Sequence, residues 1–212
     1  MPTRIVTISH ASGAGGDSIG RKVAGRLGFR YIDEEIIALA AEKEGLDPGL
    51  VADAERRKGL LERIIADFSR TQLAAADGVG GFWHPGAVGL GTRDELRELI
   101  VDAIRETAKR GDVVIVAHAA SIPLAGRDDL LRVLITASVE MRVQRVTDGT
   151  RGDAAEAAKI AEQSDKGRAD YFRRFYGIDR ELPTHYDLVV NTDVLNLEDA
   201  VDIVVSAARR RA

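Results

Sequence analysis

Short apolar runs rich in β-branched residues alternate along this chain with longer stretches whose apolar positions recur at helical spacing. The short runs lie at 4–9, 29–32, 112–117, 131–136 and 186–191. After the first run, Ile19, Val23 and Leu27 follow the spacing of one helix face, and Gly28 closes that helix. The alternation predicts an α/β fold with a parallel sheet, in which functional residues occupy the loops that follow the strands.

Capping residues place the remaining helices. Asp153 opens a charged helix that ends at Gly177, Asn196 opens the last helix, and a further helix covers 138–148. Thr92 with Glu95 forms a capping box for a helix that ends at Lys109. Helical patterns also follow Asp47-Pro48 and cover 60–76, whereas the glycine-rich segment 78–91 predicts an irregular loop that closes over a ligand.

Composition narrows the classes of function. The 212 residues are 45% hydrophobic and 30% charged, which suits one globular domain. The absence of cysteine excludes thiol catalysis, cysteine zinc sites and disulfides. A net charge of −4 gives no general attraction to nucleic acid or anionic membrane, and the cations of 209–211 suit a helix C-terminus. With neither a signal peptide nor an apolar run of about 20 residues, we expect a cytoplasmic protein with no membrane partner.

The loop after the first run is the strongest candidate for chemistry. Small residues between a strand and a helix let backbone N–H groups converge on phosphate. On the phosphate-binding motif G-x-x-x-x-G-K-[ST], the first glycine falls on His10, the second on Gly15 and the lysine on Gly16, while a hydroxyl comes one residue late at Ser18. We expect a nucleotide's phosphates to bind Ser12, Gly13, Ala14, Gly15, Gly16, Asp17 and Ser18, and a side chain added at Gly15 to obstruct them.

A dinucleotide-binding interpretation is the alternative for the same loop. Gly13 and Gly15 begin G-x-G-x-x-G, but Ser18 stands at the third glycine position. Asp33 lies twenty residues after Gly13, where a ribose-binding acid would stand, or it caps a helix at a strand end. Because no tyrosine has a lysine four residues on, the usual short-chain dehydrogenase pair is missing and a nicotinamide oxidoreductase is disfavoured.

Several blocks together resemble the cytidylate kinase-like family, a branch of the P-loop nucleoside monophosphate kinases. They are Ile8-Ser9-His10-Ala11-Ser12-Gly13-Ala14-Gly15-Gly16, Phe29-Arg30-Tyr31-Ile32-Asp33-Glu34-Glu35-Ile36-Ile37, Ser164-Asp165-Lys166-Gly167-Arg168 and Tyr186-Asp187-Leu188-Val189-Val190-Asn191-Thr192. The resemblance covers roughly 1–40 and 110–205. It implies a three-layer P-loop kinase fold: a core of 1–33, 93–150 and 181–212, an acceptor-binding lobe at 34–92 and a lid at 151–180.

The resemblance also implies roles for single residues. ATP binds the loop, Ser18 contacts Mg²⁺, and the base lies near Asn191 and Thr192. Asp33 and His118 match the acceptor site, to which the position of Arg93 adds a phosphate ligand. The lid run supplies Asp165, Lys166 and Arg168, and Arg168 is the expected source of charge on the transferred phosphoryl group.

Departures from the family pattern leave two functions open. Gly16 replaces the loop lysine, His118 replaces an acceptor-binding arginine, and the strand-end acids are absent. We expect ATP-dependent phosphorylation of a nucleoside monophosphate (cytidylate-like) or a related small phosphate acceptor, by a protein that could form homo-oligomers. The alternative is a nucleotide-sensing module of the same fold without catalysis. Arg142 and Arg145 face the nucleotide base or lie on the surface.

Overall fold

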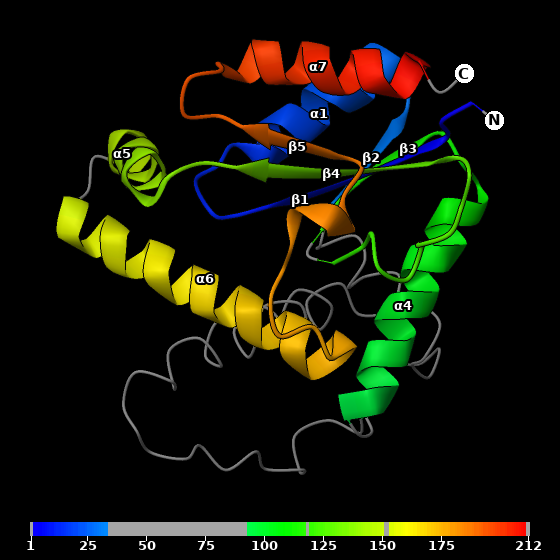
Figure 1. Cartoon of the computed structure of the whole chain (residues 1–212), viewed down its shortest axis with the longest axis horizontal. Coiled ribbons are helices and arrows are strands. Elements are labelled where there is room, and N and C mark those ends of the chain that lie inside the picture. The colour runs from blue at the N-terminus through cyan, green and yellow to red at the C-terminus, as the bar shows by residue number, and fades with distance from the viewer. Residues whose placement is uncertain (1, 34–92, 118, 151–152, 211–212) are drawn as a thin grey trace, which may run out of the picture. The chain divides into compact units, whose positions relative to one another are not determined.

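The protein is built on a five-stranded parallel sheet, which confirms the predicted α/β fold class. The computed structural model describes residues 2–33, 93–117, 119–150 and 153–210. The strands are β1 (Ile5–His10), β2 (Arg30–Asp33), β3 (Val113–Val116), β4 (Leu130–Thr136) and β5 (Leu188–Asn191), and their order across the sheet is β2-β3-β1-β4-β5 (Figure 1). The predicted strands are therefore confirmed, with ends shifted by one or two residues.

The register brings the carboxyl ends of all five strands to one edge of the sheet. His10 pairs with Ile135 and Asp33 with Val116, while Thr136 pairs with Asn191. Side chains that follow the strands therefore gather at this edge, where ligands of open parallel sheets bind.

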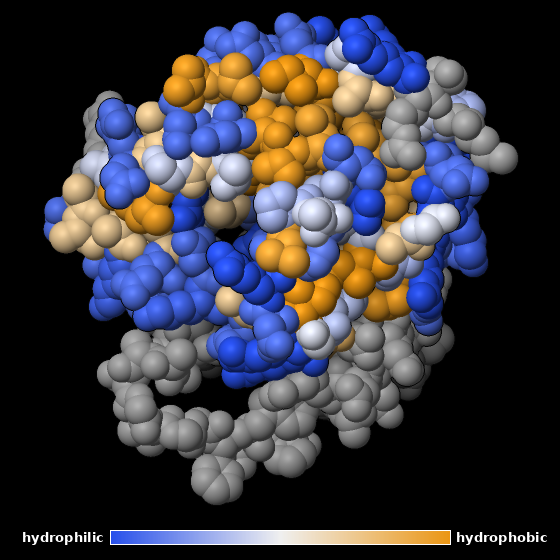
Figure 2. All heavy atoms as spheres, viewed as in Figure 1, coloured by the Kyte–Doolittle hydropathy of each residue, from blue (hydrophilic) through white to orange (hydrophobic). Residues whose placement is uncertain are grey.

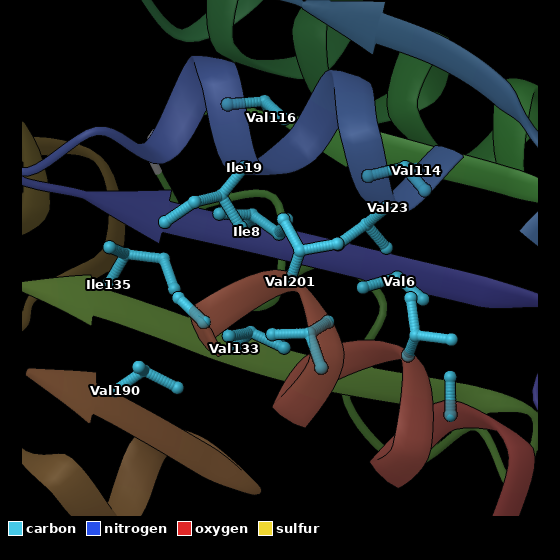
Figure 3. Close-up of a cluster of buried hydrophobic side chains, with 14 of the residues drawn as sticks. Val6, Ile8, Ile19, Val23, Val114, Val116, Val133, Ile135, Val190 and Val201 are labelled. Atoms are coloured by element: carbon cyan, nitrogen blue, oxygen red, sulfur yellow. The ribbon is translucent and has the colours of Figure 1, made fainter. Parts of the chain in front are cut away.

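One face of the sheet is covered by α1 (Gly16–Leu27) and α7 (Leu197–Arg210), which pack side by side (Figure 1). Val6 and Ile8 of β1 point to this side, where Ile19, Val23 and Val201 meet them in a fully buried cluster (Figure 3). The apolar helix face predicted from the spacing of Ile19 and Val23 is thus part of the main hydrophobic core. Asn196 caps α7 as expected, because its Oδ1 accepts from the backbone N–H groups of 198 and 199 at 2.8 and 3.0 Å.

The opposite face is covered by α6 (Ala154–Tyr176), which packs on α5 (Val139–Thr150) (Figure 1). Side chains alternate along β1, so Ser9 points away from the α1 and α7 side and meets α6. The predicted caps of α6 are confirmed, because Asp153 accepts from the N–H of residue 155 and Gly177 ends the helix in a left-handed conformation.

The segment before β5 differs from the prediction, which placed Tyr186 and Asp187 in the strand. A single 3-10 turn, η1 (Pro183–His185), precedes β5, and the N–H of Tyr186 donates to the Pro183 carbonyl. The Asp187 carboxylate then accepts from the backbone N–H and guanidinium of Arg132. The backbone N–H of Asp187 also donates to the Arg132 carbonyl at 2.8 Å, and β5 begins at the next residue, Leu188.

The chain divides into two compact units, 1–34 with 105–212 and 35–104. The last described helix to introduce is α4 (Arg93–Lys109), which Gly111 follows in a left-handed conformation. The helices predicted within 34–92, the capping box at Thr92 and the glycine-rich loop lie outside the described residues. Among the described helices, none is long and apolar enough to cross a membrane.

β5 is an outer strand of the sheet, and apolar side chains are exposed on and after it. Val189 is 39% exposed and Val194 is 95% exposed. Figure 2 shows hydrophobic surface on the side of the molecule that carries β5 and α7. Outer strands are common sites of self-association, but the homo-oligomer stays a prediction.

Candidate active site

The loop between β1 and α1 has the backbone geometry of an anion cradle. Gly13 and Gly15 have φ values of 81° and 87°, a left-handed conformation that costs glycine little. Gly15 is the N-cap of α1, and no side chain caps that helix end. The first N–H groups of α1 are therefore available to a ligand, and the helix dipole favours a negative one.

Neighbouring helices press directly against this loop. A Cβ at position 13 would lie 2.9 Å from the Arg142 carbonyl oxygen, and one at position 15 would lie 2.6 Å from Leu197 Cδ2. The expectation that a side chain at Gly15 would obstruct the phosphates is therefore corrected, because its Cβ would point at α7. A substitution there would disturb helix packing and would not test phosphate binding cleanly.

Arg142 of α5 ties the loop to α6. Its guanidinium donates to the Ser12 carbonyl at 3.2 Å and to both oxygens of Asp165, at 2.9 and 2.6 Å. The side chain is 4% exposed, and its Nε is buried without a partner among the described residues. Arg142 is thus neither a surface residue nor open to a base in this conformation. Asp165, predicted in the catalytic set, is held here as its ion-pair partner.

Arg168 of α6 sits beside the first residue of the loop. It donates to the His10 carbonyl and to Ser9 Oγ, both at 2.8 Å, and forms a two-point ion pair with Glu181 at 2.8 and 2.6 Å. Burial and the Glu181 charge raise the pKa of the Tyr186 hydroxyl, which stays protonated and donates to Glu181. The predicted catalytic arginine therefore lies at the site, with most of its donors engaged by the protein. Its action on a phosphoryl group stays a prediction.

Lys166, the third member of the predicted catalytic set, points away from these contacts. Its ammonium pairs with Glu162 at 2.7 Å on one exposed face of α6, and its side chain is 68% exposed. The neighbouring ammonium lowers the pKa of Glu162. A role for Lys166 at the site would require α6 to move.

Thr192 lies behind the loop. It is fully buried, and its Oγ1 lies 3.1 Å from the Ala14 carbonyl oxygen and accepts from Arg145 at 2.9 Å. Asn191 is exposed, and its Oδ1 accepts from the N–H of Asp193. Of the two predicted base-side residues, Thr192 therefore supports the loop from beneath, and Arg145 reaches it from α5.

Replacing Thr192 with valine should lower the free energy of unfolding by ~1–3 kcal/mol, because the buried Ala14 carbonyl and the Arg145 guanidinium lose a partner. Urea denaturation measures this change. Thr147→Val is the matched control, since the Thr147 hydroxyl donates to the Val143 carbonyl of its own helix, α5. Equal costs for the two substitutions would contradict a supporting role for Thr192.

The acceptor-side residues are only partly described. Asp33 ends β2; its Oδ2 lies 3.4 Å from Arg21, and its buried Oδ1 has no partner among the described residues. His118 lies outside the described residues, as does the side chain of Arg93 at the start of α4.

The residues at the loop fit a magnesium ion that arrives with a nucleotide. Ser18 is exposed on the first turn of α1, where its hydroxyl can reach a ligand. Within the described ranges, no group of three or more His, Asp or Glu could hold a metal by itself. Mg²⁺ commonly takes one or two protein oxygens and completes its shell with phosphate and water.

Solved structures with the same architecture have little sequence identity to this chain. An uncharacterized protein from Eubacterium ventriosum superposes with a TM-score of 0.67 at 14% identity, covering 96% of this chain and 97% of that one. Shikimate kinase from Acinetobacter baumannii in complex with shikimate gives 0.50 at 12% identity, covering 97% and 92%. The sheet order and the loop after β1 define the protein as a P-loop kinase-type fold.

Sequence comparison narrows that class. The cytidylate kinase-like family matches residues 5–194, so the chain belongs to that family. Cytidylate kinase of Aeropyrum pernix is 37% identical over 109 residues, which span 50% of this chain and 61% of that protein. Cytidylate kinase of Symbiobacterium thermophilum is 24% identical over 221 residues, covering 97% and 96%. The predicted family is therefore confirmed.

Proposed function

We propose that this protein transfers a phosphoryl group from ATP to a nucleoside monophosphate, cytidylate-like, or to a related small phosphate acceptor. The observation that carries the proposal is the glycine-turn loop at the sheet's carboxyl edge, whose helix N-terminus no side chain caps. Family membership supports it, since relatives along nearly the whole chain are named cytidylate kinases.

Phosphoryl transfer requires little covalent chemistry from a protein. It requires in-line positioning of two substrates and positive charge around the transferred group. In this proposal backbone N–H groups within 12–18 hold the ATP phosphates, and Ser18 contributes an oxygen to Mg²⁺, which neutralises phosphate charge when bound. Arg168 supplies further charge when its contacts rearrange around the substrates. Asp33, His118 and Arg93 bind the acceptor.

An ADP-release assay across nucleoside monophosphates and the matching nucleosides tests the proposal. We expect turnover with a phosphorylated acceptor and little with its nucleoside, because the acceptor phosphate is the group that Arg93 is proposed to hold. Arg93→Ala should raise the acceptor KM with a smaller change in the ATP KM. A preference for unphosphorylated acceptors would contradict the acceptor assignment.

A nucleotide-sensing module is the second candidate, and one observation favours it. Position 16 carries no lysine, and the neighbouring side chain of His10 fills the space beside it. A sensor would bind ATP at the same loop and release no ADP with any acceptor. Binding measured beside the ADP-release assay distinguishes the two candidates.

A further inference from the structure

His10 and Gly16 occupy one space from two sides. A Cβ built on Gly16 would lie 2.2 Å from Cγ and 2.5 Å from Cβ of His10. The nearest atoms include the root of the His10 side chain, which cannot swing away as a flexible end could. Position 16 therefore accepts no side chain while position 10 carries histidine.

The phosphate-binding motif has the reverse arrangement at these two positions, glycine first and lysine later. In that motif the lysine side chain extends from the start of the helix to the β- and γ-phosphates. In this chain the residue types are exchanged: the bulky, ionisable side chain comes from the end of β1, and glycine opens α1. The same volume of the loop is filled.

The contacts of the His10 ring suit a cation. The side chain is 16% exposed; Nδ1 lies 3.1 Å from the Ala11 carbonyl oxygen, and Nε2 lies 3.5 Å from an Asp17 carboxylate oxygen. A neutral imidazole has one N–H and can donate to one acceptor, whereas the imidazolium donates to both. Asp17 is 62% exposed, so its carboxylate can leave the ring without unpacking the core.

We propose that His10 is the side-chain cation of the phosphate loop and takes the place of the motif's lysine. Its Nε2–H, held by Asp17 in the absence of nucleotide, turns to a phosphate oxygen of bound ATP. The inference rests on the proposed function, because it assigns a residue to the same nucleotide site. It also explains why residue 16 is glycine, since the loop has room for only one of the two side chains.

A reciprocal exchange of the two residues tests the proposal by ATP binding, measured by calorimetry without any acceptor. His10→Gly should weaken ATP binding by about ten- to a hundredfold, the range of one charge-assisted hydrogen bond. Gly16→Lys alone should lower the melting temperature, because its Cβ meets His10. His10→Gly combined with Gly16→Lys should recover most of the lost affinity, since it restores the motif.

Two further variants keep the test decisive. His10→Asn retains a polar side chain of similar reach without the ability to carry charge, and it should lose affinity even if His10→Gly unfolds. His185→Asn is the matched control; its ring accepts from the N–H of Leu182, and it should leave ATP binding unchanged.

The outcomes separate the inference from the proposed function. Wild-type binding that persists in folded His10→Gly or His10→Asn overturns the role of His10 and leaves the nucleotide site intact. Loss in His10→Gly without recovery in the double variant overturns the exchange of roles between the two positions. A wild-type protein that binds no ATP overturns the proposed function and this inference with it.

Discussion

Replacing Arg168 with alanine should lower kcat by at least about a hundredfold, with a much smaller change in the Kd for ATP. Arginines that stabilise phosphoryl-transfer transition states contribute roughly 10³–10⁵ to the rate in enzymes where they have been dissected, and an interaction made mainly in the transition state affects kcat more than affinity. Steady-state kinetics and calorimetry measure the two effects. Arg168→Lys should restore only part of the rate, because an ammonium cannot reproduce a planar two-point contact.

The ion pair with Glu181 adds a second expected effect of the same substitution. Arg168 is 9% exposed and the Glu181 side chain 20%, so alanine at 168 leaves a mostly buried carboxylate without its partner. Breaking such a pair costs on the order of 3–5 kcal/mol of unfolding free energy. Urea denaturation should detect this loss.

Combining Arg168→Met with Glu181→Gln separates the two effects, because it removes both charges and keeps the volume filled. We expect the double variant to recover much of the stability while kcat stays low. Recovery of kcat together with stability would contradict a role for Arg168 on the phosphoryl group, because methionine carries no charge and cannot donate to the His10 carbonyl.

Replacing Arg142 with methionine should weaken ATP binding and destabilise the protein together. The Ser12 carbonyl loses its donor, and Asp165 loses both contacts that join α6 to the loop. Asp165 is 40% exposed and stays solvated without its partner, so we expect a loss of about 1–2 kcal/mol in stability, mainly from the Ser12 carbonyl hydrogen bond. Without this support the loop must be ordered when ATP binds, and the lost entropy weakens binding. We therefore expect the Kd for ATP to rise about tenfold or more.

Arg127→Met provides the matched control for Arg142. Arg127 also forms a two-point pair, with Asp129 at 2.9 and 2.8 Å, but it precedes β4 at the other end of the sheet and is 38% exposed. Pairs of this exposure contribute about 0–1 kcal/mol. Equal losses of ATP affinity in the two variants would contradict the link between Arg142 and the loop.

The fold was predictable because its signals are local. Five β-branched runs and caps such as Asp153, Gly177 and Asn196 mark the elements without knowledge of their neighbours. The strand boundary at Leu188 was missed because Pro183 starts a turn and the Asp187 carboxylate takes the Arg132 donors, a contact across 55 residues.

The candidate site was predictable only where its residues are contiguous in the sequence. The loop at 10–18 could be found from its small residues, but the supports around it come from distant elements. Nothing near Arg142 in the sequence indicates Ser12 as its acceptor, 130 residues away. The pairing of Arg168 with Glu181 was also missed: the two lie thirteen residues apart, across the helix end at Gly177. The sequence did contain one signal of the contact between His10 and Gly16. Histidine stands where the phosphate-binding motif has its first glycine, and glycine stands where the motif has its lysine.

The contact between Leu197 and Gly15 has a consequence for synthesis of the protein. The loop leaves the ribosome well before α7, yet the methyl group that packs on the loop belongs to α7. The hydrophobic face that α1 presents to Val201, Val204 and Val205 likewise has no cover until then. A nascent chain stalled before α7 emerges should therefore carry its nucleotide loop without binding ATP, and should offer that uncovered face to chaperones.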